Sequence, residues 1–168
     1  MRSITASILT FFALLSLPCI CMPEDRVFHA NVLEVVSGDT IRLKRSDSGE
    51  VITAKLSGID CPKKGQSHFI KARLFTSLRV SGREVMVQTE TRSKTDEMPA
   101  AIIWYIDAGR KKSLNSELLE AGLGRWSVPC DMADVRLGDA ENEAKKFRRG
   151  LWAEPGLAPP PGFGTVDR

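Results

Sequence analysis

Two short segments constrain the fold more than any other part of this 168-residue chain, because each carries an extended stretch into a turn that holds an aspartate. Residues 36–43 read VSGDTIRL, and residues 55–63 read KLSGIDCPK. Asp39 follows a glycine turn, and Asp60 lies just beyond an expected strand. A fold that brings these two carboxylates together offers the oxygen ligands that Ca²⁺ prefers. The alternative is a structural role, in which each aspartate caps its own turn or strand end.

The hydrophobic pattern along the chain predicts a barrel of strands with helices beside it. The segments that read as strands are residues 27–36, 40–44, 51–56, 84–88 and 101–106, with a hairpin turn at 46–49. The segments that read as helices are residues 66–78, 116–121 and 134–149. Five strands with about three helices are typical of an OB-type β-barrel, a mainly β fold with some α-helix.

Each expected helix has its own local signals. In the first, Ile70, Leu74 and Leu78 recur at every fourth position and mark the apolar face of an amphipathic helix. Asn115 is interpreted as the N-cap of the second helix, and Gly122 as its C-terminal glycine. The third helix carries apolar residues at spacings of three and four, which are Leu137, Ala140, Ala144, Phe147 and Leu151.

The two ends of the chain are expected to lie outside the folded domain, which is assigned to residues 26–153. Residues 1–22 carry one positive charge followed by an apolar run at 4–20, and this pattern predicts an export signal or an N-terminal membrane anchor. Lipidation at Cys19 is a third interpretation of the same segment. We therefore expect an exported protein, periplasmic or extracellular, with membrane contact only through this segment. Residues 154–168 are rich in proline and glycine and are expected to form a tail.

Net charge alone does not indicate a partner. Without Arg2, the 24 basic residues become 23 against 21 acidic residues, and a net charge of +2 is too small to indicate nucleic-acid binding by itself. The basic runs at 110–112 and 145–149 are interpreted as solvated loops and helix faces. Lys63 and Lys64 differ from these runs because they lie at the candidate site.

The two aspartate segments resemble those of the staphylococcal-nuclease (thermonuclease) family, whose members have a G-D-T turn followed by a G-I-D-C-P-E-K-G-Q-like run. Residues 58–66 of this chain read GIDCPKKGQ, and shorter matching blocks follow in the family's order as far as Trp152. The resemblance implies the OB-type barrel of that family. It also implies a Ca²⁺-dependent nuclease site, in which Asp39, Asp60 and the backbone carbonyl of Cys61 are the metal ligands. We expect the Ca²⁺ site of this chain to be weak or vestigial.

Three positions depart from the family's catalytic pattern. Lys63 stands where the family has the glutamate that positions or deprotonates the attacking water, and a protonated lysine cannot accept a proton. We expect its side chain to point away from the two aspartates. Ala100 stands in place of the second phosphate-clamping arginine, and Lys55 replaces the first, which keeps the charge but loses the bidentate fork. Arg92 and Lys94 are alternative cations for the second clamp.

The tyrosines that stack on the nucleotide in the family are also missing. They align near Ser127 and Cys130, and only Trp126 is aromatic there. Trp126 is therefore a candidate nucleic-acid contact together with Lys55. The alternative role for Trp126 is packing in the core.

The two cysteines outside the N-terminal segment, Cys61 and Cys130, are a candidate disulfide in an exported protein. By resemblance, both would flank the same cleft. Two unpaired thiols are the alternative, and a bridge requires Cα atoms closer than about 7 Å.

Two functions are compatible with this pattern. The first is a thermonuclease-like domain with greatly reduced or lost phosphodiesterase activity, which retains a binding role for nucleic acid, another polyanion or a protein. The second is an active Ca²⁺-dependent secreted nuclease that hydrolyses DNA or RNA with a rewired site. A cation and a further carboxylate converging on Asp39 and Asp60 would favour the second. We favour the first, because Lys63 and Ala100 remove the base and the clamp.

Overall fold

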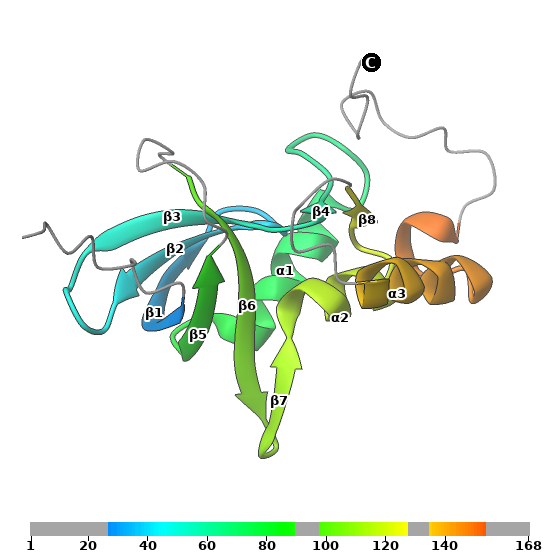
Figure 1. Cartoon of the computed structure of the whole chain (residues 1–168). Coiled ribbons are helices and arrows are strands. Elements are labelled where there is room, and N and C mark those ends of the chain that lie inside the picture. Colours follow the sequence, from blue (N-terminus) through cyan, green and yellow to red (C-terminus); the bar gives the residue numbers. More distant parts are fainter. Residues whose placement is uncertain (1–26, 90–97, 128–134, 154–168) are drawn as a thin grey trace, which may run out of the picture.

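The computed structural model describes residues 27–89, 98–127 and 135–153, which form a β-barrel with two α-helices against it and a third α-helix packed beside the second (Figure 1). The strands are β1 (Val27–Val35), β2 (Thr40–Arg45), β3 (Val51–Leu56), β4 (Ile59–Asp60), β5 (Glu84–Thr89), β6 (Ala100–Asp107), β7 (Arg110–Ser113) and β8 (Arg125–Trp126). The helices are α1 (Phe69–Val80), α2 (Leu114–Glu120), α3 (Val135–Lys146) and the 3₁₀ helix η1 (Gly150–Trp152). Within the described ranges, no helix is long and apolar enough to cross a membrane. The expected N-terminal segment and C-terminal tail lie outside these ranges.

Five strands make up the barrel. Neighbouring strands run antiparallel in the order β3-β2-β1-β5-β6, and a short parallel pairing of β3 with β6 closes the ring. The prediction of a five-stranded OB-type barrel with three helices is confirmed, and each of the five strands agrees with its expected segment to within one residue at either end. The sequence analysis missed β4, β7 and β8, which are two to four residues long and too short to show an alternating pattern.

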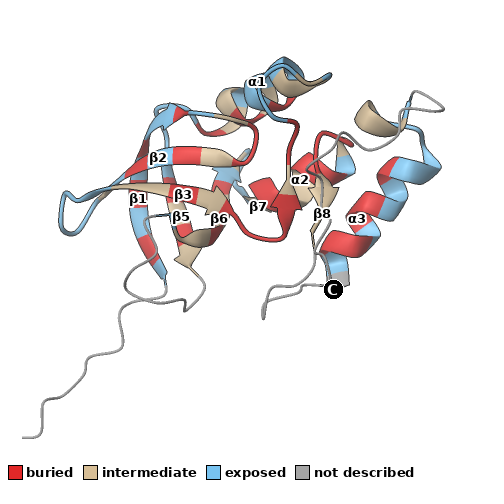
Figure 2. Cartoon of the chain, turned by 90° about the horizontal axis from the view of Figure 1, so that it is seen from above, coloured by how far each residue is buried: buried red, intermediate tan, exposed pale blue. Residues whose placement is uncertain are grey.

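Every second residue of the barrel strands points into the core. In β2 and β5 the buried side chains are those of Ile41, Leu43, Val85 and Val87, while their neighbours are partly or fully exposed. Figure 2 shows buried and more exposed residues alternating along the strands. Each fully buried side chain of this kind stabilises the fold by about 1.5–3 kcal/mol.

The expected orientation of α1 is wrong. The helix begins at Phe69, and Ile70, Leu74 and Leu78 are 76%, 55% and 69% exposed instead of facing the core. The buried face consists of smaller residues, which are Ala72, Thr76 and Val80.

The reason is the close approach of α1 to the turn at Gly38. A Cβ atom at Gly38 would lie 2.8 Å from the Cβ atom of Ala72, which is well inside van der Waals contact. The hydroxyl of Thr76 donates a hydrogen bond of 2.7 Å to the carbonyl oxygen of Gly38. Because only small side chains fit between these backbones, the large apolar residues lie on the solvent side. The contact also fixes the turn that carries Asp39.

The expected N-cap of α2 is also wrong. Ser113 caps the helix, and its hydroxyl accepts a hydrogen bond of 3.3 Å from the backbone N–H three residues further on. Asn115 lies two residues after this cap, in the first turn of the helix, and is fully buried. Its Oδ1 accepts the N–H of Ile103 at 3.1 Å, and its Nδ2 donates to the carbonyl oxygens of Ser57 at 2.9 Å and Ala101 at 3.2 Å. The asparagine therefore joins α2 to β6 and to the end of β3.

The ends of α2 and α3 pack against each other through two glycines. Gly122 ends α2 as predicted, with φ +67°, and Gly150 follows α3 with φ +54°. A Cβ atom at either position would overlap a backbone carbonyl oxygen of the other segment. The N–H of Leu151 donates a hydrogen bond of 2.8 Å to the carbonyl oxygen of Gly122. This contact holds η1 beside the end of α2.

α3 ends at Lys146, three residues earlier than expected. Leu137, Ala140 and Ala144 are buried as its apolar face. Phe147, which was expected on the same face, lies beyond the helix and is 56% exposed. The N–H of Phe147 still donates to the carbonyl oxygen of Glu143 at 3.0 Å, and the chain turns directly after it at Arg148, whose φ is +51°.

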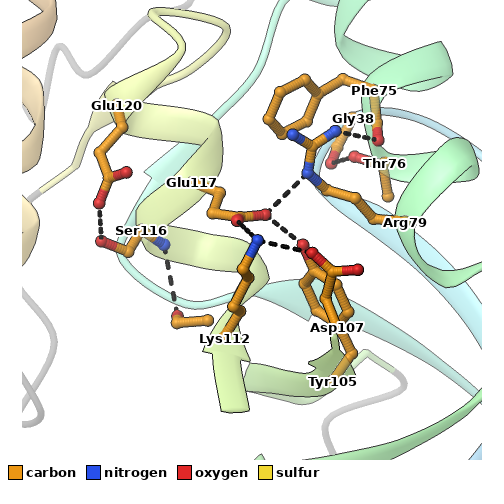
Figure 3. A network of polar contacts seen from close by, with 11 residues as sticks. Gly38, Phe75, Thr76, Arg79, Tyr105, Asp107, Lys112, Ser116, Glu117 and Glu120 are labelled. Atoms are coloured by element: carbon orange, nitrogen blue, oxygen red, sulfur yellow. Dashed lines mark hydrogen bonds and ion pairs between the residues drawn. The ribbon is translucent and has the colours of Figure 1, made fainter. Parts of the chain in front are cut away.

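A polar network centred on Glu117 connects two helices with two strands (Figure 3). Nε of Arg79 donates to Oε2 of Glu117 at 2.7 Å, and the hydroxyl of Tyr105 donates to the same oxygen. Nζ of Lys112 lies 3.5 Å from Oε1 of Glu117 and 2.7 Å from Oδ2 of Asp107. Burial would raise the pKa of Glu117, but the hydrogen bonds from Tyr105 and Arg79 outweigh it and lower the pKa below its ordinary value of 4.5.

Glu117→Gln should lower the free energy of unfolding by about 1–2 kcal/mol at neutral pH, because charged hydrogen bonds become neutral ones. The lowered pKa of Glu117 means that its contribution is present above the pKa of the unfolded chain and is lost as pH falls through the folded-state pKa. The difference between the parent and the variant should therefore close in acid. Urea unfolding at a series of pH values measures it, and Glu120→Gln on the same helix is the matched control. A difference that does not narrow as the pH falls would contradict this role.

Candidate functional site

Asp39 is held inside the turn between β1 and β2 and is only 1% exposed. The hydroxyls of Ser37 and Thr40 donate to its Oδ1 at 2.6 Å and 3.3 Å. The backbone N–H of Cys61 donates to its Oδ2 at 3.2 Å. The carboxylate thus caps its own turn and also joins it to the second aspartate segment. The structure brings together the two segments that the sequence analysis singled out.

Asp60 lies at the end of β4, which pairs with β8 so that Asp60 and Arg125 are partners. Nζ of Lys55 donates a hydrogen bond of 2.7 Å to Oδ1 of Asp60. Partial burial lowers the pKa of Lys55, but the hydrogen bond to Asp60 and the negative charges of Asp60 and Asp39 together raise it above its ordinary value. Lys55 is therefore a charged ammonium at neutral pH.

Lys63 points toward the aspartates, so the expectation that it points away is wrong. Its Nζ lies 3.7 Å from Oδ2 of Asp39, and its side chain remains 58% exposed. Its backbone N–H donates to Oε1 of Gln66 at 2.7 Å, which fixes the loop that presents it. A buried carboxylate needs compensation for the water that it has lost, and the ammonium of Lys63 supplies part of it. Each aspartate therefore has its own lysine.

Ala100 lies beside Lys55. The two residues are partners in the parallel pairing of β3 with β6, and the N–H of Lys55 donates to the carbonyl oxygen of Pro99 at 3.0 Å. The methyl side chain of Ala100 brings no charge to this edge of the site. Arg92 and Lys94, the alternative cations, lie outside the described residues.

The donor set at this site does not fit Ca²⁺. Ca²⁺ takes six to eight oxygen ligands, several of them carboxylates. Here both oxygens of Asp39 accept hydrogen bonds, and an ammonium group contacts each aspartate. Within the described ranges, no group of three or more His, Cys, Asp or Glu side chains is arranged to hold a metal ion. A cation bound between Asp39 and Asp60 would have to displace or tolerate both lysines.

Trp126 packs against α3. Its ring atoms lie 3.2–3.4 Å from the position that a Cβ atom at Gly138 would take, and the ring is partly buried against the core. Its backbone N–H donates to Oε1 of Glu141 at 3.0 Å. The core-packing role is thus seen directly. A nucleic-acid contact of Trp126 stays a prediction.

A cavity of about 260 Å³ lies beside Asp60. Residues of α3, of η1, of β8 and of the position after β8 form its other walls, and they are Arg125, Trp126, Ser127, Glu141, Lys145 and Trp152. Glu141 is a further carboxylate at this place, but it already accepts the N–H of Trp126 and a hydrogen bond of 2.6 Å from Lys145. The sequence analysis did not find Arg125, Glu141 or Trp152 as site residues. The one available signal was the place of Arg125 just before Trp126.

Cys61 is fully buried beside Asp39. Burial and, second, the charge of Asp39 raise the pKa of its thiol well above the ordinary value, so the thiol is protonated at neutral pH. Cys130 lies outside the described residues, and the disulfide between Cys61 and Cys130 stays a prediction.

A closed OB-type barrel with two aspartates meeting at one edge defines a nuclease-like domain. The family described as "Staphylococcal nuclease homologue" matches residues 53–154, and the chain belongs to this family. An "uncharacterized endonuclease" of Escherichia coli O157:H7 is 29% identical over 132 residues, which cover 79% of this chain and 82% of that protein. A "micrococcal nuclease" of Shigella flexneri is 25% identical over 148 residues, which cover 84% of this chain and 83% of that protein. A "ribonuclease TUDOR 2" of Arabidopsis thaliana is 33% identical over 89 residues, which cover 50% of this chain and 9% of that protein.

Proposed function

We propose that this chain is an exported nucleic-acid-binding domain of the nuclease family, with greatly reduced or lost phosphodiesterase activity. The observation that carries the proposal is the pair of lysine–aspartate contacts. Lys55 lies 2.7 Å from Asp60, and Lys63 lies 3.7 Å from Asp39. Two ammonium groups thus contact the two carboxylates that the family resemblance assigns to the metal ion.

The loss of activity has two further physical causes. General-base catalysis is worth about 10²–10⁴ in rate, and the ammonium of Lys63 has no lone pair with which to accept a proton. An arginine that stabilises a phosphoryl transition state can contribute about 10³–10⁵, and Ala100 contributes nothing of this kind. The two factors are not multiplied, because groups that act as one unit are not additive. The loss of the general base or of the arginine, each taken alone, would slow hydrolysis at this site by at least about 10²-fold.

A binding role is supported by the charges that remain. Lys55 contacts Asp60, Lys63 contacts Asp39, and Arg125 pairs in register with Asp60. Positive groups outnumber negative ones here, and phosphate contacts of this kind supply most sequence-independent nucleic-acid affinity. The relatives named as nucleases act on the same class of polymer.

Export is proposed from the sequence of residues 1–22, with the one charge before the apolar run at 4–20. The same segment would serve as a membrane anchor if it is retained. Either fate places the domain on the far side of the membrane.

The proposal predicts that the purified full chain binds a single-stranded DNA of about 15 nucleotides without cleaving it at millimolar Ca²⁺. Ca²⁺ should also raise the melting temperature by less than about 1 °C, because a ligand stabilises only by as much as it binds the folded state. Gel analysis of labelled DNA and thermal denaturation measure the two effects. Asp60→Asn serves as the control for contaminating nuclease.

Cleavage that is lost in the Asp60→Asn variant would overturn the proposal and establish a working Ca²⁺-dependent nuclease with a rewired site. A large increase in melting temperature at sub-millimolar Ca²⁺ would likewise show that the two lysines do not exclude the ion. Absence of DNA binding would remove the binding role but would leave the assignment of lost catalysis intact.

A further inference from the structure

The last turn of α3 and the residues that follow it combine four cations with an exposed aromatic ring. Phe147 is 56% exposed and lies in the run of residues 145–149, which reads KKFRR. Nζ of Lys146 lies 5.6 Å from the centroid of the Phe147 ring, and Cζ of Arg149 lies 4.9 Å from it. The sequence analysis interpreted this basic run as a solvated face of a helix. In the structure the run also exposes the apolar ring of Phe147, with two cations close to it.

This run continues into the cavity beside Asp60. Trp152 lies between two cations, with Cζ of Arg125 at 4.9 Å and Nζ of Lys145 at 4.7 Å from its ring centroid. All three of these residues line the cavity that Asp60 also lines. Positive groups therefore extend from the contact of Lys55 with Asp60, through a cavity that the carboxylates of Asp60 and Glu141 also line, to Phe147.

The acidic residues of α3 balance only part of this charge. Glu141 accepts a hydrogen bond from Lys145 at 2.6 Å, and Glu143 lies 3.6 Å from Arg149. Within the described part of the chain, neither Lys146 nor Arg148 forms an ion pair. Both are exposed and can contact an anion without losing a partner.

We propose that this basic–aromatic surface, formed by Arg125, Lys145, Lys146, Phe147, Arg148 and Trp152, binds single-stranded nucleic acid. The inference rests on the binding role proposed above and gives it a location that begins beside Asp60 and extends away from the two aspartates along the end of α3. Phosphates lie along the cations, and an unpaired base stacks on Phe147, in the way that aromatic platforms bind single strands. A duplex offers no free base face, and a sulfated polysaccharide offers no base at all.

The test is fluorescence anisotropy of a labelled single strand of about 15 nucleotides with the full chain over a range of salt concentrations. Lys146→Gln with Arg148→Gln should reduce the slope of log K against log salt by about 1.4, since each lost phosphate contact is worth about 0.7. Phe147→Ala should weaken binding about tenfold and leave the slope unchanged, because stacking is worth about 1–3 kcal/mol per base. The matched control is Arg110→Gln with Lys111→Gln, which removes the same charge from the exposed turn at β7 and should leave the slope near that of the parent.

Heparin and duplex DNA separate stacking from charge. Phe147→Ala should leave the affinity for both unchanged, whereas the Lys146 and Arg148 variant should weaken both. An equal loss for heparin in Phe147→Ala would show that the ring only supports the local structure, and would overturn the stacking assignment. If the parent binds the single strand and the surface variants bind equally well, this surface is wrong while the proposed binding function stands. If the parent itself does not bind, both fail.

Discussion

Lys63→Glu combined with Ala100→Arg should confer Ca²⁺-dependent cleavage of single-stranded DNA, with a rate at least about 10²-fold above that of the parent chain. The side chain at position 63 already reaches Asp39, since its Nζ lies 3.7 Å from Oδ2. A glutamate there would remove one ammonium and supply a third carboxylate to the site. Position 100 is the pairing partner of Lys55, so an arginine would add a guanidinium beside the existing cation.

Initial rates of cleavage at millimolar Ca²⁺, with chelator as a blank, measure this effect. The matched control is Lys64→Glu with Ala100→Arg, which makes the same change of charge at the neighbouring exposed lysine and should gain much less. High activity in the parent would show that the site is rewired and that the aspartate–lysine contacts do not abolish catalysis. Absence of activity in the double variant, despite an increase in melting temperature with Ca²⁺, would show that a restored ion site is insufficient on this scaffold.

The barrel could be predicted from the sequence because each strand shows its own alternation of apolar and polar residues. Ile41 and Leu43 in one strand, and Val85 and Val87 in another, alternate with more polar neighbours, and a half-buried strand imposes this period. The two aspartate segments could also be placed together, but only through the resemblance to a known family. The hydrogen bond from the N–H of Cys61 to Asp39 could not be predicted from the pattern of residues within either segment.

The errors arose where a contact between distant segments decides the outcome. Helix α1 has its large apolar side chains on the solvent side because Gly38 and Ala72 approach too closely for any larger group. Periodicity reveals that a helix has two faces but not which of them meets a turn more than thirty residues away.

The direction of the Lys63 side chain likewise depends on a residue that is distant in the sequence, Asp39. As a surface lysine it would remain in water, where its charge is best solvated. It turns inward because Asp39 is 1% exposed and carries a charge that the surrounding hydrogen bonds balance only in part. The cavity beside Asp60 was missed for the same reason, since Arg125, Lys145 and Trp152 belong to three separate elements that converge only in the folded chain.

Asn115→Ala should be the most destabilising single substitution proposed for this chain, with an expected loss of about 3 kcal/mol in the free energy of unfolding. The side chain is fully buried and makes three hydrogen bonds, to the N–H of Ile103 and to the carbonyl oxygens of Ser57 and Ala101. Alanine would leave these groups buried without their partner, and each unsatisfied group costs about 1–3 kcal/mol less any relaxation. For a domain of this size the melting temperature should fall by about 10 °C.

Asn142→Ala on the exposed side of α3 is the matched control, and its free energy of unfolding should change by less than about 0.5 kcal/mol. Amide hydrogen exchange gives a readout specific to the proposed contact, because the Ile103 N–H should lose its protection more than its neighbours in β6 do. A melting temperature within about 2 °C of the parent, or unchanged protection at Ile103, would show that water or a local shift replaces the asparagine. The expected loss would confirm that a residue read as a helix cap from its sequence instead joins α2 to the barrel edge that presents Lys55 and Ala100.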